Sequence, residues 1–357
     1  MPGVYIIAEA GVNHNGDITT ALKMIDAAVA AGVDGVKFQT FRVEHLVSAT
    51  AAKASYQKEA TDSQETQREM LEKLTLSDSD HHRLQAHCQE HNVDFLSTPF
   101  DCISLDFLIN QLGLRKLKLS SGAINHGPLL LAAGQSGADI ILSSGLSNIG
   151  EVEQALMVLS YGLLNCSEPP SLSGFYEAFA SIEGKVALQN SVTLLHCTTQ
   201  YPAPMKDINL RAMDILRLAF GLDVGFSDHS LGISAPLAGV ARGAKVIEKH
   251  FTLDRTMAGP DHKASLSLDE LQQMVRGIRE VELALGEARK VITNSEIENR
   301  SVVRSSLTAL CDIAQGTVFT EENLGVKRPG NGISPINYWD FLGQIAKRDF
   351  AKDEAIE

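Results

Sequence analysis

The stretch VGFSDHSLGISAPLAGVARGAKVIEKHF, residues 224–251, contains two runs of aliphatic and β-branched residues, and both runs end on polar side chains. The same pattern recurs in VKFQT (36–40) and FLSTPF (95–100). A buried strand has no structural need to end on Lys, Gln, Ser, Asp, Glu or His. Polar groups that recur at strand ends therefore indicate one shared, charged pocket, as in enzymes built on parallel strands.

Strand-like and helix-like segments alternate along most of the chain. The eight predicted strands cover residues 5–10, 35–40, 94–100, 116–121, 139–145, 193–198, 224–229 and 245–251. Helical patterns with a Ser or Thr cap at the start and a Gly or Asn near the end lie between them. The alternation predicts an α/β fold, a (β/α)₈ TIM barrel over residues 1–285. The rival, a doubly wound sheet, would predict GxGxxG after the first strand, and AEAGVNHNG (8–16) does not match it.

Four further segments complete the domain organisation. Residues 41–78 exceed ordinary loop length, contain the helix-prone run SQETQREMLEKL, and are expected to form a lid or substrate wall. Residues 161–191 precede the sixth strand and are given no catalytic role. A polar linker, 286–301, leads to a Gly- and Pro-punctuated segment, 302–357. We expect this segment to be a small, β-rich second domain.

Composition narrows the classes of partner. A net charge of −13 argues against nucleic acid or an anionic membrane surface, so an anionic substrate needs local lysines. The five cysteines show no CxxC spacing, which argues against a disulfide framework or a zinc knuckle. With no signal-like or membrane-spanning segment at the N-terminus, we expect a cytoplasmic protein.

Strand parity predicts which polar residues face the pocket, because side chains two apart share a face of a strand. The inward pairs predicted in this way are Lys37 with Gln39, His196 with Thr198, Ser227 with His229, and Glu248 with His250, while Asp228 and Lys249 point outward. A lone histidine is more often a hydrogen-bonded core residue. Two imidazoles on neighbouring strands beside carboxylates favour a Mn²⁺, Zn²⁺ or similar ion.

Two lysines, Lys37 and Lys118, lie near the ends of apolar strands, with Ser120, Ser121, Ser143 and Ser144 close by. A lone lysine is usually a solvated surface group, but a lysine at the end of an apolar strand is expected to be buried, and a buried lysine needs a counter-charge. Two ammonium groups with hydroxyls predict a site for a phosphate or a phosphorylated carboxylate. His196 and Cys197 are adjacent and so face opposite ways, which argues against a nucleophilic dyad.

These residues lie in motifs that together resemble the sialic acid synthase family, the nonulosonate-forming N-acetylneuraminate and legionaminate synthases. The motifs are IAEAGVNHNG, VKFQT, STPFD, KLKLSSG, LLHCTTQYPAP, NLRAM, GFSDHSLGI, IEKHFTLD, GPDHKAS and RPGNGI. They span essentially the whole chain. The last belongs to a segment similar to type III antifreeze proteins, the antifreeze-like (SAF) domain.

The resemblance implies a TIM barrel with a C-terminal SAF domain that covers the active site of the partner in a domain-swapped homodimer. It places a divalent metal, Mn²⁺ or Mg²⁺, on His229 and His250. It places phosphoenolpyruvate on Lys37, Thr98, Lys118, Ser121, Ser143, Thr199 and Ser227, and the N-acetylated amino sugar on Glu9, Gln39, Tyr201, Asp261 and Arg328. Glu248 joins Glu9, Lys37, Lys118, His229 and His250 in the predicted catalytic set.

The implied reaction joins C3 of phosphoenolpyruvate to the metal-polarised aldehyde of the open-chain sugar, adds water at C2 and releases phosphate by C–O cleavage. One departure is Ala123, where many relatives have Glu; Asn125 or Glu9 could substitute. The main expectation is N-acetylneuraminate synthesis from an N-acetylmannosamine-type sugar. The alternative is N,N'-diacetyllegionaminate synthesis from 2,4-diacetamido-2,4,6-trideoxymannose. A non-catalytic carbohydrate-binding barrel and a metal-dependent pyruvate aldolase are less favoured readings.

Overall fold

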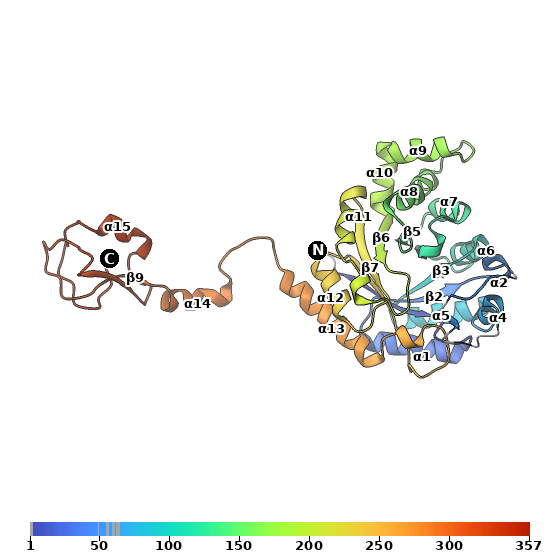
Figure 1. Cartoon of the computed structure of the whole chain (residues 1–357), viewed down its shortest axis with the longest axis horizontal. Helices are drawn as coiled ribbons and strands as arrows, with labels where there is room; N and C mark the ends of the chain where they lie inside the picture. The colour runs from blue at the N-terminus through green and yellow to red at the C-terminus, as the bar shows by residue number, and fades with distance from the viewer. Residues whose placement is uncertain (1–2, 49, 55–56, 59–60, 62–64) are drawn as a thin grey trace. The chain divides into compact units, whose positions relative to one another are not determined.

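The computed structural model describes residues 3–48, 50–54, 57–58, 61 and 65–357. The chain divides into two compact units, Met1–Gly286 and Glu287–Glu357 (Figure 1). Among the described residues, no helix combines the length and the apolar composition that crossing a membrane requires.

The first unit is built on eight parallel strands, as predicted. They are β1 (Tyr5–Gly11), β2 (Gly35–Thr40), β3 (Asp94–Pro99), β4 (Lys116–Leu119), β5 (Asp139–Ser143), β6 (Val192–Cys197), β7 (Asp223–Asp228) and β8 (Val246–His250). Their order in the sheet is β3-β2-β1-β8-β7-β6-β5-β4. The two end strands, β3 and β4, lie next to each other, and Lys116 Nζ is 3.0 Å from Asp94 Oδ2 between them. The sheet thus forms a nearly closed barrel, and the TIM-barrel prediction is confirmed.

Helices surround the strands (Figure 1). The main ones are α1 (Ile18–Ala31), α5 (Asp78–Glu90), α6 (Cys102–Asp106) continued by a π-helix (Phe107–Gln111), α7 (Gly127–Gln135), α8 (Ile149–Leu163), α11 (Ala212–Phe220), α12 (Ser234–Ala241) and α13 (Leu268–Leu285). Short 3₁₀ turns occur at Ser121–Ala123, Met205–Asp207 and His262–Ala264. Asp17, Ser77 and Ser267 cap α1, α5 and α13 by accepting from backbone N–H groups, which satisfies donors that have no partner inside a helix.

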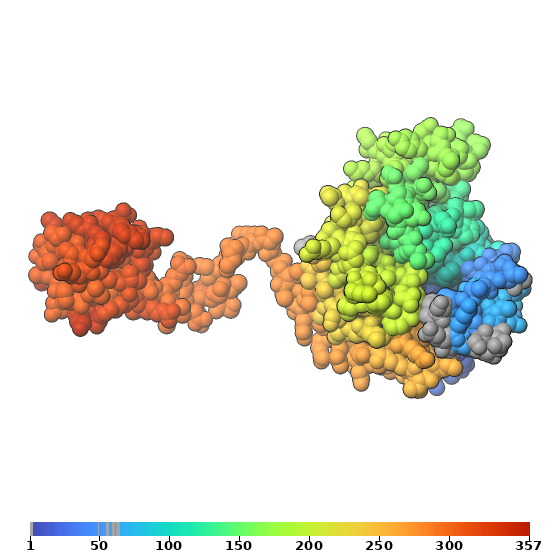
Figure 2. All heavy atoms as spheres, viewed as in Figure 1, coloured from blue at the N-terminus to red at the C-terminus, as the bar shows by residue number. Residues whose placement is uncertain are grey.

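Two long segments interrupt the alternation. Segment 41–78 contains α2 (Val43–Leu46) and α4 (Gln67–Glu72). Of the helix-prone run predicted there, residues 63 and 64 lie outside the described residues. Segment 161–191 contains the end of α8 together with α9 (Leu172–Ala180) and α10 (Ile182–Ser191), which pack against α8. In Figure 2 the light-green α9 and α10 stand out from the surface of the first unit.

A layer of apolar side chains fills the barrel interior. This apolar floor consists of Ile7, Leu96, Ile141, Leu195 and Val246, all buried in one cluster. Because inward side chains recur every second residue, the next inward positions are Glu9, Thr98, Ser143, Cys197 and Glu248. The change from apolar to polar inside the barrel therefore takes place within one pleat of the strands.

The second unit has its own core of Leu307, Ala309, Ile313, Phe319, Leu324, Ala346, Phe350 and Ile356. Its elements are α14 (Asn294–Val303), antiparallel β9 (Ser306–Ala309) and β10 (Leu324–Lys327), a 3₁₀ turn (Pro335–Asn337) and α15 (Tyr338–Phe341). The predicted linker, 286–301, thus includes most of a helix. A capping box between Thr293 and Glu296 starts that helix.

Candidate functional site

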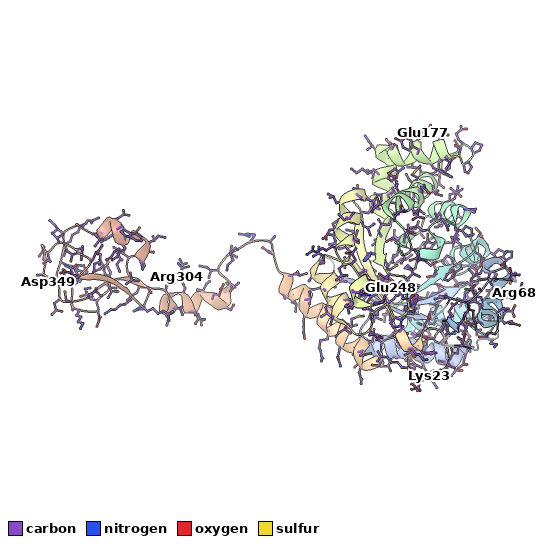
Figure 3. All side chains as sticks on the ribbon, viewed as in Figure 1. Lys23, Arg68, Glu177, Glu248, Arg304 and Asp349 are labelled. Carbon is purple, nitrogen blue, oxygen red and sulfur yellow. The ribbon has the colours of Figure 1, made fainter. Side chains whose placement is uncertain are left out.

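A cavity of about 280 Å³ opens at the carboxyl ends of the strands. Every site residue predicted in the barrel lines it: Glu9, Lys37, Gln39, Thr98, Lys118, Ser121, Ser143, Thr199, Tyr201, Ser227, His229, Glu248, His250 and Asp261. Figure 3 labels Glu248 in the middle of the barrel. The structure therefore gathers residues from seven of the eight strands, together with Thr199 and Tyr201 from the loop that follows β6, into one pocket.

Two lysines and two carboxylates form a buried charge cluster in this pocket. Lys37 Nζ lies 2.6 Å from Glu9 Oε2 and 3.7 Å from Glu248 Oε2, and Lys118 Nζ lies 3.4 Å from Glu248 Oε1. Lys37 also donates to Thr98 Oγ1 at 3.0 Å, and Ser227 donates to Glu248 Oε1 at 2.7 Å. The buried lysines thus have the counter-charges that burial demands.

The two carboxyls of the cluster have very different proton affinities. Burial opposes ionisation of Glu248, but Lys118 and Lys37 outweigh it and bring its pKa down to about 2. Burial dominates at Glu9 and raises its pKa to about 7, although Lys37 acts in the opposite direction. Two acids whose environments push their pKa values apart can take different roles at neutral pH, one as a fixed charge and one as a proton carrier.

Hydroxyl groups without hydrogen-bond partners face the same cavity. Among the described residues, Ser120 Oγ, Ser143 Oγ and Thr199 Oγ1 are buried and have no partner. Ser121 Oγ accepts from the Gly145 N–H at 3.0 Å. A Cβ on Gly145 would lie 2.3 Å from Thr199 Oγ1, so a glycine is required where the backbone approaches these hydroxyls. Unpaired buried donors indicate a place for a ligand with acceptor oxygens.

His229 and His250 lie side by side at the ends of β7 and β8, with ring centroids 5.6 Å apart. His229 Nδ1 is 2.7 Å from the Thr198 carbonyl, which can accept but not donate, so the proton is on Nδ1. The Tyr201 hydroxyl then donates to His229 Nε2 at 3.2 Å. Among the described residues, His250 Nδ1 is buried without a hydrogen-bond partner and lies 3.9 Å from Asp261 Oδ2.

Both imidazoles are neutral at pH 7. Burial lowers the pKa of His229 to about 4, and burial together with His229 lowers the pKa of His250 well below its usual value. Burial raises the pKa of Asp261 to about 6. Neutral imidazole is the form in which histidine binds metals, and a backbone carbonyl on the other nitrogen, as at His229, is the usual orienting partner. His250 Nδ1 has no hydrogen-bond partner among the described residues, and the Tyr201 hydroxyl would release His229 Nε2 when an ion binds. The residues present therefore fit a divalent ion.

Strand parity was right for β2, β7 and β8 and wrong for β6. Asp228 and Lys249 point away from the pocket and pair with each other. On β6, His196 is in register with Phe226, stacks on it and meets the Ile208 carbonyl, so it faces the helices. Thr198 also faces away from the pocket, since its hydroxyl donates to Asp207 O. The register with β7 puts Cys197 beside inward Ser227, which reverses the predicted faces.

Part of the pocket is lined by carbon atoms, which we call the apolar wall, although the side chains of Gln57 and Gln67 from the same segment also line the cavity. It consists of Val12, Phe41, Leu46, Val47, Met70, Leu71, Leu74 and Phe100, which line the cavity and belong to one hydrophobic cluster. Sequence reasoning placed a substrate wall in segment 41–78 without naming these residues. The spacing of Met70, Leu71 and Leu74 predicts the buried face of a helix, and this pattern does not distinguish a core residue from one that contacts a ligand.

The remaining predicted residues lie elsewhere. Ala123, the one departure from the family pattern noted above, is buried in the hydrophobic core. Of its two suggested substitutes, Glu9 lines the cavity, whereas Asn125 is not among the described lining residues. Arg328 is exposed in the second unit, between β10 and Pro329. None of the residues of segment 161–191, all of them described, lines the cavity.

Comparison with known proteins covers nearly the whole chain. Residues 24–290 match the model of the NeuB family, and residues 304–357 match the model of the SAF domain. The chain is 46% identical over 356 residues to the N,N'-diacetyllegionaminic acid synthase of Campylobacter jejuni subsp. jejuni serotype O:2, covering 100% of this chain and 99% of that one. It is 40% identical over 339 residues to the Legionella pneumophila protein of the same name, covering 95% and 89%.

Among solved structures, the chain is similar to the N-acetylneuraminic acid (sialic acid) synthetase from Leptospira borgpetersenii serovar Hardjo-bovis in complex with citrate. The TM-score is 0.67 and the identity 33%, with 84% of this chain and 90% of that chain covered.

Proposed function

The chain belongs to the NeuB family of nonulosonate synthases, and from this premise we propose that it condenses phosphoenolpyruvate with 2,4-diacetamido-2,4,6-trideoxymannose to give N,N'-diacetyllegionaminate. The relatives that bear the name of this activity are 40% and 46% identical to the chain, against 33% for the sialic acid synthetase. This difference favours the trideoxy sugar over N-acetylmannosamine, the substrate that the sequence alone favoured.

The apolar wall is the observation that carries the choice of sugar. A 6-deoxy sugar ends in a methyl group, and burying one carbon of this kind is worth about 0.8 kcal/mol. A 6-hydroxyl buried against carbon atoms without a partner costs about 1–3 kcal/mol. With C6 placed on the apolar wall, out of reach of the Gln57 and Gln67 amides, these terms together favour the trideoxy sugar by about 2–4 kcal/mol, which corresponds to roughly 30- to 1000-fold in kcat/KM.

In the proposed reaction the charge cluster holds phosphoenolpyruvate. Lys37 and Lys118 pair with its phosphate and carboxylate oxygens, and the unpaired hydroxyls of Ser143 and Thr199 donate to the same oxygens. The C3 carbon forms the new bond to the sugar aldehyde, water adds at C2, and the C2–O bond breaks as phosphate leaves. The lysines then stabilise the charge that grows on the departing phosphate.

Glu9 is the proposed proton carrier and takes the place of the carboxyl absent at Ala123. Its raised pKa lets it gain or lose a proton near pH 7, and Gln39 Nε2 lies 3.4 Å from its Oε1. Glu248 remains ionised and keeps the lysines charged. Asp261 and Tyr201 would orient the hydroxyl and acetamido groups of the sugar.

His229 and His250 would hold a divalent ion, Mn²⁺ or Mg²⁺, which would polarise the aldehyde oxygen as a Lewis acid. Dialysis against a chelator should remove activity, and addition of Mn²⁺ should restore it. Full turnover in metal-free buffer would contradict this assignment. We also propose a domain-swapped homodimer in which Arg328 of one chain completes the sugar site of the other.

The test of the sugar assignment is phosphate release with phosphoenolpyruvate and each of the two sugars. We expect kcat/KM to be higher for the trideoxy sugar by a factor of roughly 30 or more. The variant Met70→Gln should reduce that ratio, because its amide offers a partner to a hydroxyl. Arg68→Gln on the same helix is the control, since Arg68 is partly exposed and pairs with Glu72. An equal or better rate with N-acetylmannosamine would refute the assignment.

A further inference from the structure

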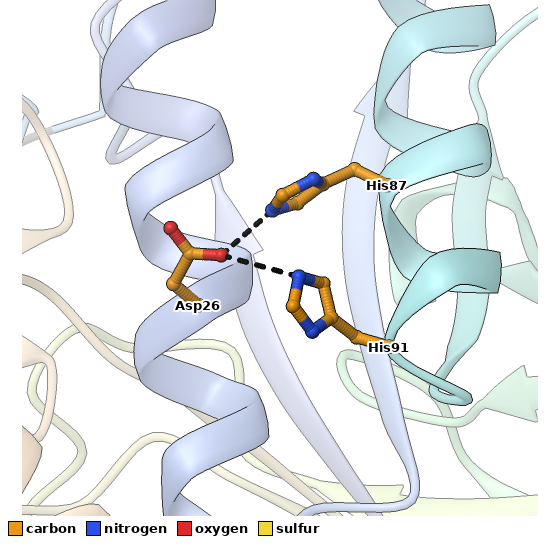
Figure 4. Close-up of side chains that lie close together, drawn as sticks. All are labelled: Asp26, His87 and His91. Carbon is orange, nitrogen blue, oxygen red and sulfur yellow. Dashed lines mark hydrogen bonds and ion pairs between the residues drawn. The ribbon is translucent and has the colours of Figure 1, made fainter.

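A second group of metal-binding side chains lies outside the pocket, between α1 and α5. It consists of Asp26 on α1, His87 on α5 and His91, the residue that caps the C-terminal end of α5 (Figure 4). One ligand atom from each lies within 4.8 Å of the others. None of the three is among the described residues that line the pocket.

The distances within the group are close to those that a bound zinc ion would require. His87 Nε2 is 2.6 Å from Asp26 Oδ1, and His91 Nε2 is 3.8 Å from the same oxygen. Four ligands around a tetrahedral zinc ion with bonds of 2.0–2.1 Å are about 3.4 Å apart. The first contact would lengthen and the second would shorten by less than about 1 Å, which side-chain rotation can supply.

The surroundings favour binding of an ion from solvent. The side chains of His87, His91 and Asp26 are 24%, 41% and 56% exposed, so an ion can reach them directly from solvent. The other ring nitrogen of His87, Nδ1, is 3.8 Å from Glu90 Oε2, beyond hydrogen-bonding distance, so a side-chain rotation would have to bring this carboxylate closer before it could orient a ligating imidazole.

We propose that Asp26, His87 and His91 bind a divalent transition ion, preferably Zn²⁺, and that the ion ties α1 to α5. Two imidazole nitrogens and one carboxylate oxygen are ligands that suit zinc. The three protein ligands leave a position for water. This site is separate from the metal proposed for His229 and His250.

The bound ion would join parts of the chain that are far apart in sequence. Asp26 and His87 are separated by 61 positions, and the intervening segment contains Lys37, Gln39 and most of the apolar wall. A link across such a segment limits the unfolded chain and favours the folded one. Zinc should therefore stabilise the part of the barrel that carries the sugar side of the pocket.

The experiment counts zinc ions per chain by competition with a chromophoric chelator. It uses the full-length wild type and the variants His87→Gln and His91→Gln. We expect the wild type to bind one more Zn²⁺ per chain than either variant. At a free zinc concentration of 100 times Kd, the wild-type Tm should rise by about 5 °C more than that of the variants.

His82→Gln is the matched control, because His82 is exposed on the same helix and is not part of the group. It should bind as many zinc ions as the wild type. Without zinc, all variants should keep the wild-type Tm to within about 2 °C and the wild-type kcat. Equal zinc binding by the wild type and both variants would overturn the proposal, as would an equal loss in His82→Gln.

Discussion

Replacing Lys118 with methionine removes one of the two ammonium groups that face the pocket while keeping most of the side-chain volume. Glu248, its partner at 3.4 Å, retains the hydrogen bond from Ser227 and the ion pair with Lys37, so no buried acid is left alone. A hydrogen bond to a charged group is worth about 1.5–3 kcal/mol. We therefore expect kcat/KM for phosphoenolpyruvate to fall roughly 10- to 150-fold.

The assay is phosphate release with each substrate varied in turn, together with calorimetric titration of phosphoenolpyruvate. The KM for the neutral sugar should change less than about threefold, because no charge is removed from its side of the pocket. Lys116→Met is the control: Lys116 lies two residues earlier on β4 and pairs with Asp94 and the Tyr5 ring at the other end of the barrel. Equal losses for both substrates, or a comparable loss in the control, would refute the reasoning.

Three further predictions concern a proton, the stability of the barrel and the dimer. Glu9 loses its proton as the pH rises through about 7, and the ionised carboxylate then competes with phosphoenolpyruvate for Lys37. The affinity for phosphoenolpyruvate, measured by calorimetry, should therefore fall from pH 6 to 8, and Glu9→Gln should flatten this pH profile. An unchanged slope in the variant would contradict the role of Glu9. Lys249→Met leaves Asp228 buried without its counter-charge and should lower the free energy of unfolding, measured in urea, by about 3–5 kcal/mol. A loss of less than about 1 kcal/mol would show that the fold does not depend on this ion pair. Mixing inactive Arg328→Ala with inactive His229→Ala under subunit exchange should restore part of the activity, and heterodimers without activity would rule out sharing of the site.

The sequence was enough for the strands and for the polar residues on most of them. The endings of VKFQT, VGFSDH and KVIEKHF fix the inward faces of β2, β7 and β8 because a two-residue period leaves one choice once a charged group is known to face the pocket. The same rule failed for His196, since β6 carries polar groups on both faces. The register of His196 with Phe226 on β7 decides which face His196 takes, and this register depends on residues far apart in the sequence.

Contacts between distant segments were beyond sequence reasoning. The apolar wall joins Val12 and Phe100 to residues of α2 and α4, and hydrophobic residues in a sequence do not say whether carbon or a ligand will cover them. Asp26 and His87 likewise come together because α1 and α5 pack side by side. The helix at Asn294–Val303 could have been anticipated from Thr293 and Glu296, which form its capping box.

The apolar floor closes the pocket at one end and so sets the order in which substrates bind and products leave. Lys37 stands in register with Leu96 and Lys118 with Ile141, so both lysines start at the level of the side chains that close the barrel, at the bottom of the pocket. In the proposed reaction the molecule bound to the lysines must be first in and last out. Phosphoenolpyruvate would load before the sugar, and phosphate would depart after the nine-carbon product, which makes phosphate an inhibitor competitive with phosphoenolpyruvate. Five buried hydrocarbon side chains would thus set the kinetic sequence without touching a reacting atom.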